Sequence, residues 1–387
     1  MGGKCAICIV EVILLKHLRN LKTKASHHQL KTLLYDGYRF ALSHRATIEA
    51  GALQVYYSAL PFTPHDTLLY KTYAPEEAKS MHVLRGVPAE WSPCLASLEG
   101  GHGSITSVAY SHDGTLFALG FNSEFITVRA ALAGELLSSF EYSAPQQILS
   151  LAFLPSDKYL VAGTTAGTIA QWSILTASIV QSYAGHTSST TCVAVCAKAP
   201  NIMASASKDA TIRLWDVSTG ECSGVLLCHD SPVFAVAFMP DGACLLSGSE
   251  DGIVRIWDVS TPSACSEVRA VSAHQSGISA LAISPDGRTY CTGSINHLVK
   301  IFAMDADLPT FTLTDHANKI TWLAYTVNGE TLLSAGHDER HARLWNTSNG
   351  ALRGLTRGYV TQAAFSPNGE QLVTGEPICY QLQSTRR

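Results

Sequence analysis

Histidine, serine and aspartate recur together along the chain, and these three residue types form the catalytic triads of many hydrolases. The groups are His186, Ser205 and Asp209; His229, Ser247 and Asp251; and His316, Ser334 and Asp338. A catalytic triad occurs once in an enzyme, whereas these groups return about every 42 residues, the period of a structural repeat. We therefore expect them to be architectural, and we expect the protein not to be an enzyme.

Two other patterns that could do chemistry are incomplete. Cys5 and Cys8 form a CxxC pair, but no second pair follows at the spacing of a structural zinc site. Met1-Gly2-Gly3-Lys4 resembles the end of a phosphate-binding loop, yet the full GxxxxGK[ST] motif is absent. The sequence therefore predicts no metal and no cofactor.

Charge and hydropathy limit the partners. Residues 1–46 hold eight Lys and Arg against two acids, while residues 47–387 hold nineteen against twenty-nine. The larger part is acidic, which argues against nucleic acid as a partner. The apolar run at 5–15 is too short and too charged to span a bilayer. The scattered cysteines show no disulfide framework, so we expect a reducing, cytoplasmic location, with the nucleus left open.

A repeat organises most of the chain. Seven apolar segments centre on an alanine between two larger residues: Ala109, Ala152, Ala194, Ala237, Ala282, Ala324 and Ala364. Turn sequences such as SHDG (111–114) and SPDG (284–287) follow most of them, and Gly there supplies the positive φ of tight hairpins. A second apolar strand, another turn and a third strand such as IVRIWDV (253–259) complete the unit.

The period of the repeat and its Trp-Asp endings resemble those of a known protein family. The segment from Trp91 onward resembles a Trp-Asp (WD) repeat β-propeller with seven four-stranded blades. In this family the outer strand of the last blade usually comes from the N-terminal side of the repeats, a role that residues 94–99 could fill. The resemblance implies an all-β, seven-bladed propeller over residues 91–387.

The resemblance also assigns roles to the recurring polar residues. In the family a His, a Ser or Thr, an Asp and a Trp form a buried hydrogen-bonded tetrad in each blade. The implied structural tetrads are His186, Ser205, Asp209 and Trp215; His229, Ser247, Asp251 and Trp257; and His316, Ser334, Asp338 and Trp345. The third set has one extra residue in its turn. The other blades depart from the pattern, the first and the last most strongly.

The family further implies a partner-binding face formed by the residue just before the turn Asp of each blade. Those positions are Phe121, Thr165, Lys208, Glu250, Ile295 and His337. The set mixes apolar residues with both signs of charge, as a contact with a protein or peptide does, and it lacks the uniform positive charge that nucleic acid attracts. For each single residue, a plain solvated loop position is the alternative.

The residues before the propeller divide into two parts. Residues 1–60 are predicted to be helical, because Ser26 and Gln29 form a capping box before apolar residues at helical spacing. Residues 61–90 are predicted to be an irregular connector, because Pro61, Pro64, Pro75 and Pro88 interrupt them.

The connector carries a second resemblance. The stretch GALQVYYSALPFTPHDTLLYKTYAPEE (51–77), with EWSPCLASLEGH (90–102), is similar to the junction before WD repeats in fungal NACHT-type signalling ATPases of the STAND class. Two functions follow. The first is a non-catalytic scaffold that binds proteins or peptides through its loop faces, and the alternative is the ligand- or partner-sensing half of such an ATPase. The oligomeric state is left open.

Overall fold

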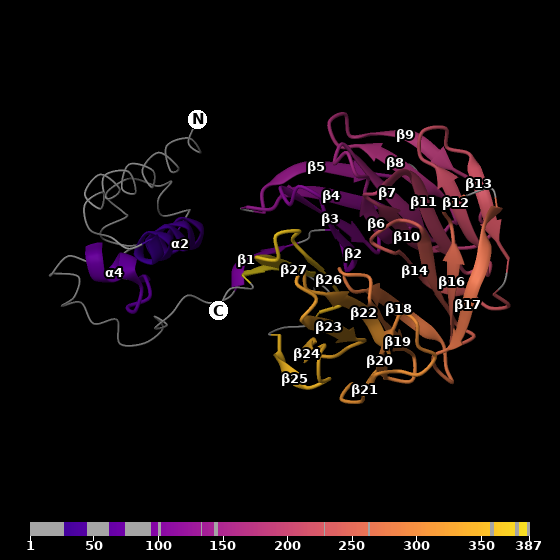
Figure 1. Ribbon diagram of the computed structural model, residues 1–387. Helices are drawn as coiled ribbons and strands as arrows, with labels where there is room; N and C mark the ends of the chain where they lie inside the picture. Colours follow the sequence, from indigo (N-terminus) through magenta and orange to yellow (C-terminus); the bar gives the residue numbers. More distant parts are fainter. Residues whose placement is uncertain are drawn as a thin grey trace. The chain divides into compact units, whose positions relative to one another are not determined.

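The computed structural model describes residues 27–44, 62–73, 94–99, 102–132, 134–142, 146–227, 229–261, 264–356, 360–375 and 379–384. The Cys5 and Cys8 pair and the capping residue Ser26 lie outside these ranges. The chain divides into two compact units, Met1–Ala96 with Arg386–Arg387, and Ser97–Thr385. The first holds two described helices and the second holds the sheets (Figure 1).

The first unit contains the helix α2 (His27–Ser43). Leu33, Asp36, Arg39 and Phe40 are buried, and their spacing of three and four residues places them on one face of the helix. Helical periodicity predicted this element.

A second helix, α4 (Leu68–Tyr73), lies inside residues 61–90, where the sequence predicted an irregular connector. Thr67 begins the helix, because its hydroxyl accepts a hydrogen bond from the Tyr70 amide at 3.2 Å. Asp36 Oδ2 accepts further bonds from the amides of Leu68, at 2.7 Å, and Leu69, at 3.3 Å. The carboxylate of α2 thus satisfies amides of α4 that have no partner within their own helix.

The second unit consists of four-stranded antiparallel sheets, six of which are each built from four consecutive strands and are called blades one to six (Figure 1). Blade one holds β2 (Ile105–Tyr110), β3 (Leu116–Phe121), β4 (Phe125–Ala130) and β5 (Leu136–Glu141). Blade two holds β6 (Ile148–Phe153), β7 (Tyr159–Thr164), β8 (Ile169–Ser173) and β9 (Ser178–Tyr183). Blade three holds β10 (Thr190–Cys196), β11 (Ala199–Ser207), β12 (Ile212–Asp216) and β13 (Cys222–Leu226).

The remaining blades follow the same order. Blade four holds β14 (Val233–Phe238), β15 (Cys244–Ser249), β16 (Ile253–Asp258) and β17 (Ser266–Ser272). Blade five holds β18 (Ile278–Ile283), β19 (Thr289–Ser294), β20 (Val299–Ala303) and β21 (Phe311–Leu313). Blade six holds β22 (Ile320–Tyr325), β23 (Thr331–Gly336), β24 (Arg343–Asn346) and β25 (Leu352–Leu355).

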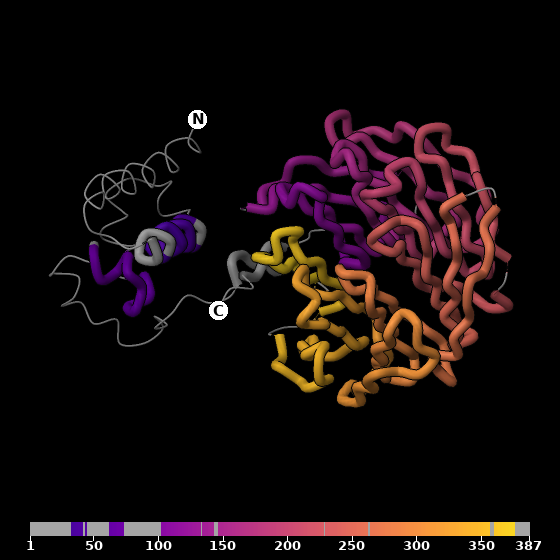
Figure 2. The backbone as a smooth tube through the Cα atoms, in the orientation of Figure 1, coloured from indigo at the N-terminus to yellow at the C-terminus, as the bar shows by residue number. Residues whose placement is uncertain are grey.

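A seventh sheet, called the closing sheet, combines strands from distant parts of the sequence. It has the order β1 (Cys94–Glu99), β28 (Cys379–Ser384), β27 (Gln371–Gly375) and β26 (Gln362–Phe365). As expected, residues 94–99 supply its outer strand. Thr361 Oγ1 donates a hydrogen bond to the Ile105 carbonyl at 3.4 Å, which joins this sheet to blade one. The tube in Figure 2 shows the yellow C-terminal strands beside the purple strands of blade one.

The first hairpin turns link neighbouring blades on one side of the propeller. Gly114 has a φ of 72° and its backbone lies against Pro367, while Gly329, with a φ of 71°, faces Pro285 in the same manner. Both glycines adopt the left-handed conformation that a side chain disfavours. The pairing of Gly114 with Pro367 connects blade one to the closing sheet, so the turns contribute to a closed ring.

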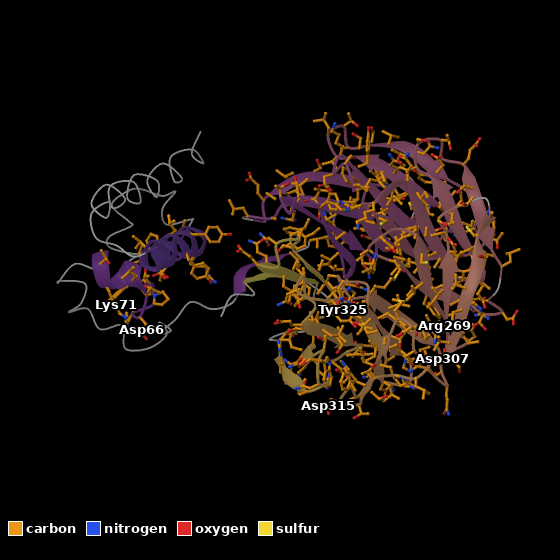
Figure 3. All side chains as sticks on the ribbon, viewed as in Figure 1. Asp66, Lys71, Arg269, Asp307, Asp315 and Tyr325 are labelled. Atoms are coloured by element: carbon orange, nitrogen blue, oxygen red, sulfur yellow. The ribbon has the colours of Figure 1, made fainter. Side chains whose placement is uncertain are left out.

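The core is divided among the spaces between the blades, which side chains fill (Figure 3). Blade two, for example, packs Trp172 against Phe140 of blade one, with ring centroids 5.3 Å apart. Polar links bridge the blades at the outside, such as the bond from Arg269 Nε to Asp307 Oδ1 at 2.9 Å. Each blade therefore depends on its neighbours for burial, as in other repeat architectures.

Candidate functional site

The recurring polar residues meet inside blade three. The Trp215 indole donates to Ser205 Oγ at 2.8 Å, and Ser205 Oγ lies 2.7 Å from His186 Nε2. His186 Nδ1 in turn lies 2.9 Å from Asp209 Oδ2. With Nδ1 protonated, each donor in this series has one acceptor. Ser205 is fully buried, so no substrate could reach its hydroxyl.

Blade four repeats the arrangement and adds an arginine. His229 lies 2.9 Å from both Ser247 Oγ and Asp251 Oδ2, and Trp257 donates to Ser247 at 2.9 Å. Arg255 Nη1 donates to the same Asp251 oxygen at 2.9 Å. A charge-assisted bond of this kind strengthens the connection between the second turn and the third strand.

Blade six departs from the predicted tetrad. His316 Nε2 lies 2.6 Å from Ser334 Oγ and Trp345 donates to that oxygen at 2.8 Å, but His316 Nδ1 lies 2.7 Å from Glu339 Oε2. Asp338 is outside the network, and its side chain is 80% exposed and contacts His337. The assignment of Asp338 is therefore corrected to Glu339.

The extra residue in the turn explains the change. Asp338 has a φ of 56°, whereas in blade three the left-handed conformation falls one residue later in the turn, at Ala210 with a φ of 65°. The residue after Asp338 must then reach the histidine, and the longer side chain of Glu339 does so. Its Oε1 also accepts the amides of Ala317, at 2.7 Å, and Asn318, at 3.1 Å. A glutamate directly after the expected Asp was the available sequence signal.

Burial sets the protonation of these groups. Burial lowers the pKa of His186, His229 and His316 and outweighs the opposing effect of their carboxylate partners. Burial by itself would raise the pKa of Asp209, but hydrogen bonds from Thr211, Thr187 and His186 hold it at about 2. Each network therefore pairs a neutral imidazole with an ionised carboxylate at neutral pH.

Blade five keeps only part of the network. His274 Nε2 lies 2.8 Å from Thr292 Oγ1, and Phe302 stands where the tryptophan would donate. His274 Nδ1 is buried, and within the described part of the chain no group forms a hydrogen bond with it. Burial, followed by the charge of Lys300, lowers the pKa of His274 to about 4.

Five of the six predicted partner-binding residues occupy equivalent backbone positions at one end of the second strands, called the rim. The backbone amide at each position donates to the loop before the inner strand of its blade: Thr165 to Gln147, Lys208 to Ser189, Glu250 to Pro232, Ile295 to Gly277 and His337 to Lys319. Lys208, Glu250, Ile295 and His337 are exposed, and Thr165 is half-buried. Thus the fold fixes their backbone and leaves their side chains free to vary.

Blade one requires a correction at the rim. Phe121 is fully buried and packs edge-on against His102, with centroids 5.5 Å apart. The amide that donates to the preceding loop is that of Asn122, which bonds to the Ser104 carbonyl at 2.8 Å. The rim residue of blade one is therefore Asn122. Blade one lacks the tetrad residues that would have set its register, and a slip of one residue moves a side chain to the other face.

Among the described residues, no group of three or more His, Cys, Asp and Glu side chains could hold a metal ion. Within the same residues, no helix has the length and apolar character needed to cross a membrane.

Comparison with curated proteins finds relatives that match parts of this chain. Vegetative incompatibility protein HET-E-1 of Podospora anserina, a fungal NACHT/WD protein, is 38% identical over 120 residues, which are 31% of this chain and 9% of that protein. Autophagy-related protein 16 of Arabidopsis thaliana is 27% identical over 172 residues, or 44% of this chain and 33% of that protein. Human F-box-like/WD repeat-containing protein TBL1Y is 56% identical over 41 residues, covering 11% and 8%. The chain thus spans at most a third of these relatives.

Repeat matches cover more than half of the chain. The family described as WD domain, G-beta repeat matches residues 92–124, 134–173, 177–216, 220–258, 265–302 and 308–346. The expected seventh repeat is not matched, because the strands β26 to β28 follow residue 346 and lack the tetrad residues. Six matched repeats, five of which end at the third strand of a blade, establish that this chain belongs to the WD40 family.

Proposed function

We propose that the protein is a non-catalytic scaffold that binds a protein or peptide across the rim residues Asn122, Thr165, Lys208, Glu250, Ile295 and His337. The observation that carries the proposal is the contrast between a constant backbone and varied side chains at these positions. A repeat position that served the fold alone would hold similar residues in successive blades, as the tetrads do.

The chemistry of the rim favours a polypeptide. Lys208 and Glu250, exposed on neighbouring blades, offer opposite charges, and Ile295 on the next blade offers an apolar contact with 37% of its surface exposed. Polypeptide interfaces combine an apolar centre with charges that set orientation, whereas a nucleic-acid surface is dominated by one sign. Membership of the WD40 family, whose propellers generally act as interaction scaffolds, supports the same conclusion.

Charge reversal at the rim tests the proposal. Wild-type protein and a Lys208→Glu, Glu250→Lys variant are tagged, expressed in cells and captured after brief crosslinking, and the co-purified proteins are quantified by mass spectrometry. We expect the variant to recover at least one abundant partner at about one tenth of the wild-type amount. Each reversed side chain would face a charge of its own sign on the partner, and such repulsion costs more than about 1 kcal/mol.

The matched control is Lys158→Glu with Glu330→Lys, which reverses two exposed charges next to the opposite ends of the second strands. This variant carries the same net charge as the rim variant and should retain the partner. Equal retention by both variants, or equal loss from both, would contradict binding at the rim.

A second candidate is the sensing part of a NACHT/STAND signalling ATPase. The similarity to HET-E-1 favours it, together with the junction-like stretch at 51–77. The intact mass of the endogenous protein, captured with an antibody against the propeller, distinguishes the two candidates. A mass near 41.5 kDa supports the stand-alone scaffold. A much larger chain with a nucleotide-binding domain supports the sensor.

A further inference from the structure

A cavity of about 430 Å³ opens between blades two and three. It is lined by Leu154, Pro155, Ser156, Tyr159, Gln171, Val180, Gln181, Pro200, Asn201, Val217 and Ser218. Tyr159 begins the strand that Thr164 ends just before the rim residue Thr165, so the cavity lies at the opposite end of that strand from the rim. None of the lining residues carries a charge, which favours an uncharged ligand.

Gln171, which lines the cavity, differs in residue type from the equivalent residue of every other sheet. It is 7% exposed and lies opposite Val161 in the strand pairing of blade two. The other sheets hold an aliphatic residue at the same register position: Val128, Leu214, Ile256, Ile301, Leu344 and Leu382. A buried amide costs stability unless it is hydrogen-bonded, so a single polar exception among seven sheets needs a reason other than the fold.

The hydrogen-bond partner of Gln171 uses the oxygen of its side-chain amide and leaves the NH2 group able to bind a ligand. Tyr183, 1% exposed, donates its hydroxyl to Gln171 Oε1 at 2.6 Å. Tyr183 is itself an exception, because blade one has Phe140 and blade three has Leu226 at that position. No acceptor among the described residues bonds to Gln171 Nε2, whose two N–H groups therefore remain for a carbonyl in the cavity.

One side of this cavity is formed by a strand edge that pairs with no further strand among the described residues. β9 is the outermost strand of blade two, and two of its residues, Val180 and Gln181, line the cavity. Val180 is the extra residue of a β-bulge and is 47% exposed, and the adjacent Ile179 is exposed as well. An unpaired edge with apolar side chains offers backbone hydrogen bonds and side-chain contacts to an added strand.

We propose that this cavity binds an uncharged, extended peptide segment of a partner protein, which pairs with the outer edge of β9. One apolar side chain of the segment enters the cavity, and a backbone carbonyl accepts a hydrogen bond from Gln171 Nε2. The site is separate from the rim, so its failure would leave the proposed rim function unaffected.

The test uses a pool of synthetic, end-capped heptapeptides whose three central positions carry all residue types. The full chain is incubated with the pool, and bound peptides are identified by mass spectrometry. The enriched peptides are then labelled and titrated by fluorescence anisotropy, and hydrogen exchange locates the contact. We expect enrichment of peptides with an apolar central residue and no charge, together with slower amide exchange at residues 178–183.

Two variants and two matched controls assign the binding. Val180→Lys places a charge on the edge, while Val268→Lys does so at the corresponding bulge of blade four. The double variant Gln171→Val, Tyr183→Phe gives blade two the pair that blade one has in Val128 and Phe140, and Ile256→Val changes the equivalent position in blade four.

We expect Val180→Lys and the double variant each to weaken binding by about tenfold or more, because an added charge and a lost hydrogen bond each reach that size. Both controls should bind as the wild type does. Enrichment of charged peptides, no enrichment at all, or binding that survives in Val180→Lys would overturn the proposal. Because Val180 is exposed, that variant remains informative if the double variant does not fold.

Discussion

Asp157, in the first turn of blade two, lies with its Oδ1 3.0 Å from His112 Nδ1 in the first turn of blade one. The same carboxylate accepts the backbone amides of His112, at 2.8 Å, and Asp113, at 2.9 Å. Asp157 has a φ of 55°, the conformation that glycine adopts at the same place in blade one, Gly114. Its side chain therefore provides an inter-blade link that glycine could not.

Asp157→Gly tests this link without adding backbone strain. We expect the free energy of unfolding to fall by about 1–3 kcal/mol, because two amides and an imidazole lose their acceptor. Asp157→Ala should lower it further, since alanine disfavours a positive φ. Urea unfolding at neutral pH measures both variants. A glycine variant as stable as the wild type would show that the link contributes nothing.

Asp251→Ala should lower the melting temperature of the protein. The substitution removes the acceptor of both His229 and Arg255, and a buried polar group without its partner costs about 1–3 kcal/mol. Asp258→Ala is the control, because Asp258 is exposed and, among the described residues, its side chain bonds only to nearby Ser260. Differential scanning calorimetry compares the variants, and equal melting temperatures for them would argue against the network.

Glu339 and Asp338 should differ in their effect on stability. Glu339→Gln keeps the size of the side chain but removes the charge that His316 and Arg343 face, so we expect a loss of about 1–3 kcal/mol. Asp338→Asn should change little, because the side chain is exposed and asparagine tolerates a positive φ. Chemical denaturation of the two variants checks the order. A larger effect at Asp338 would restore the family assignment.

Stability should fall with acidity in a window set by His274. Its pKa is about 4 in the folded protein and near 6.5 when unfolded, so the unfolded state binds the proton first. Stability is therefore complete above pH 6.5 and is lost as the pH falls toward 4. Melting temperatures between pH 7 and pH 4 should decline less in His274→Gln than in the wild type. Parallel declines would show that His274 does not contribute.

The repeat architecture was predictable because local chemistry repeats. The alanine-centred segments and the Gly turns fall at regular intervals in the sequence. The structure has a strand at each alanine-centred segment and a positive φ at the turn glycines. Two histidine tetrads, those of Trp215 and Trp257, assemble from the residues that the family pattern named. Regular spacing is sufficient to predict a tetrad in a blade where all four of its residues are present.

Tertiary effects account for what the sequence did not predict. The short helix α4 depends on Asp36, which is 32 residues before Leu68. No local sequence pattern therefore predicts this helix. The rim residue of blade one is set by the register in which its strands pair. The sequence of blade one does not fix that register to within one residue. Gln171 becomes conspicuous only when the register of all seven sheets is compared.

The closing sheet has a consequence for the order of synthesis. Blades one to six each pair strands that follow one another directly, so the strands of each blade are available to pair soon after its own residues leave the ribosome. β1 must instead remain without its sheet partner until β28, almost the whole propeller later, has been made. During synthesis the chain therefore carries a first strand that the C-terminal strands of another copy could pair with, so we expect exchange of β1 between chains when assembly of this sheet fails.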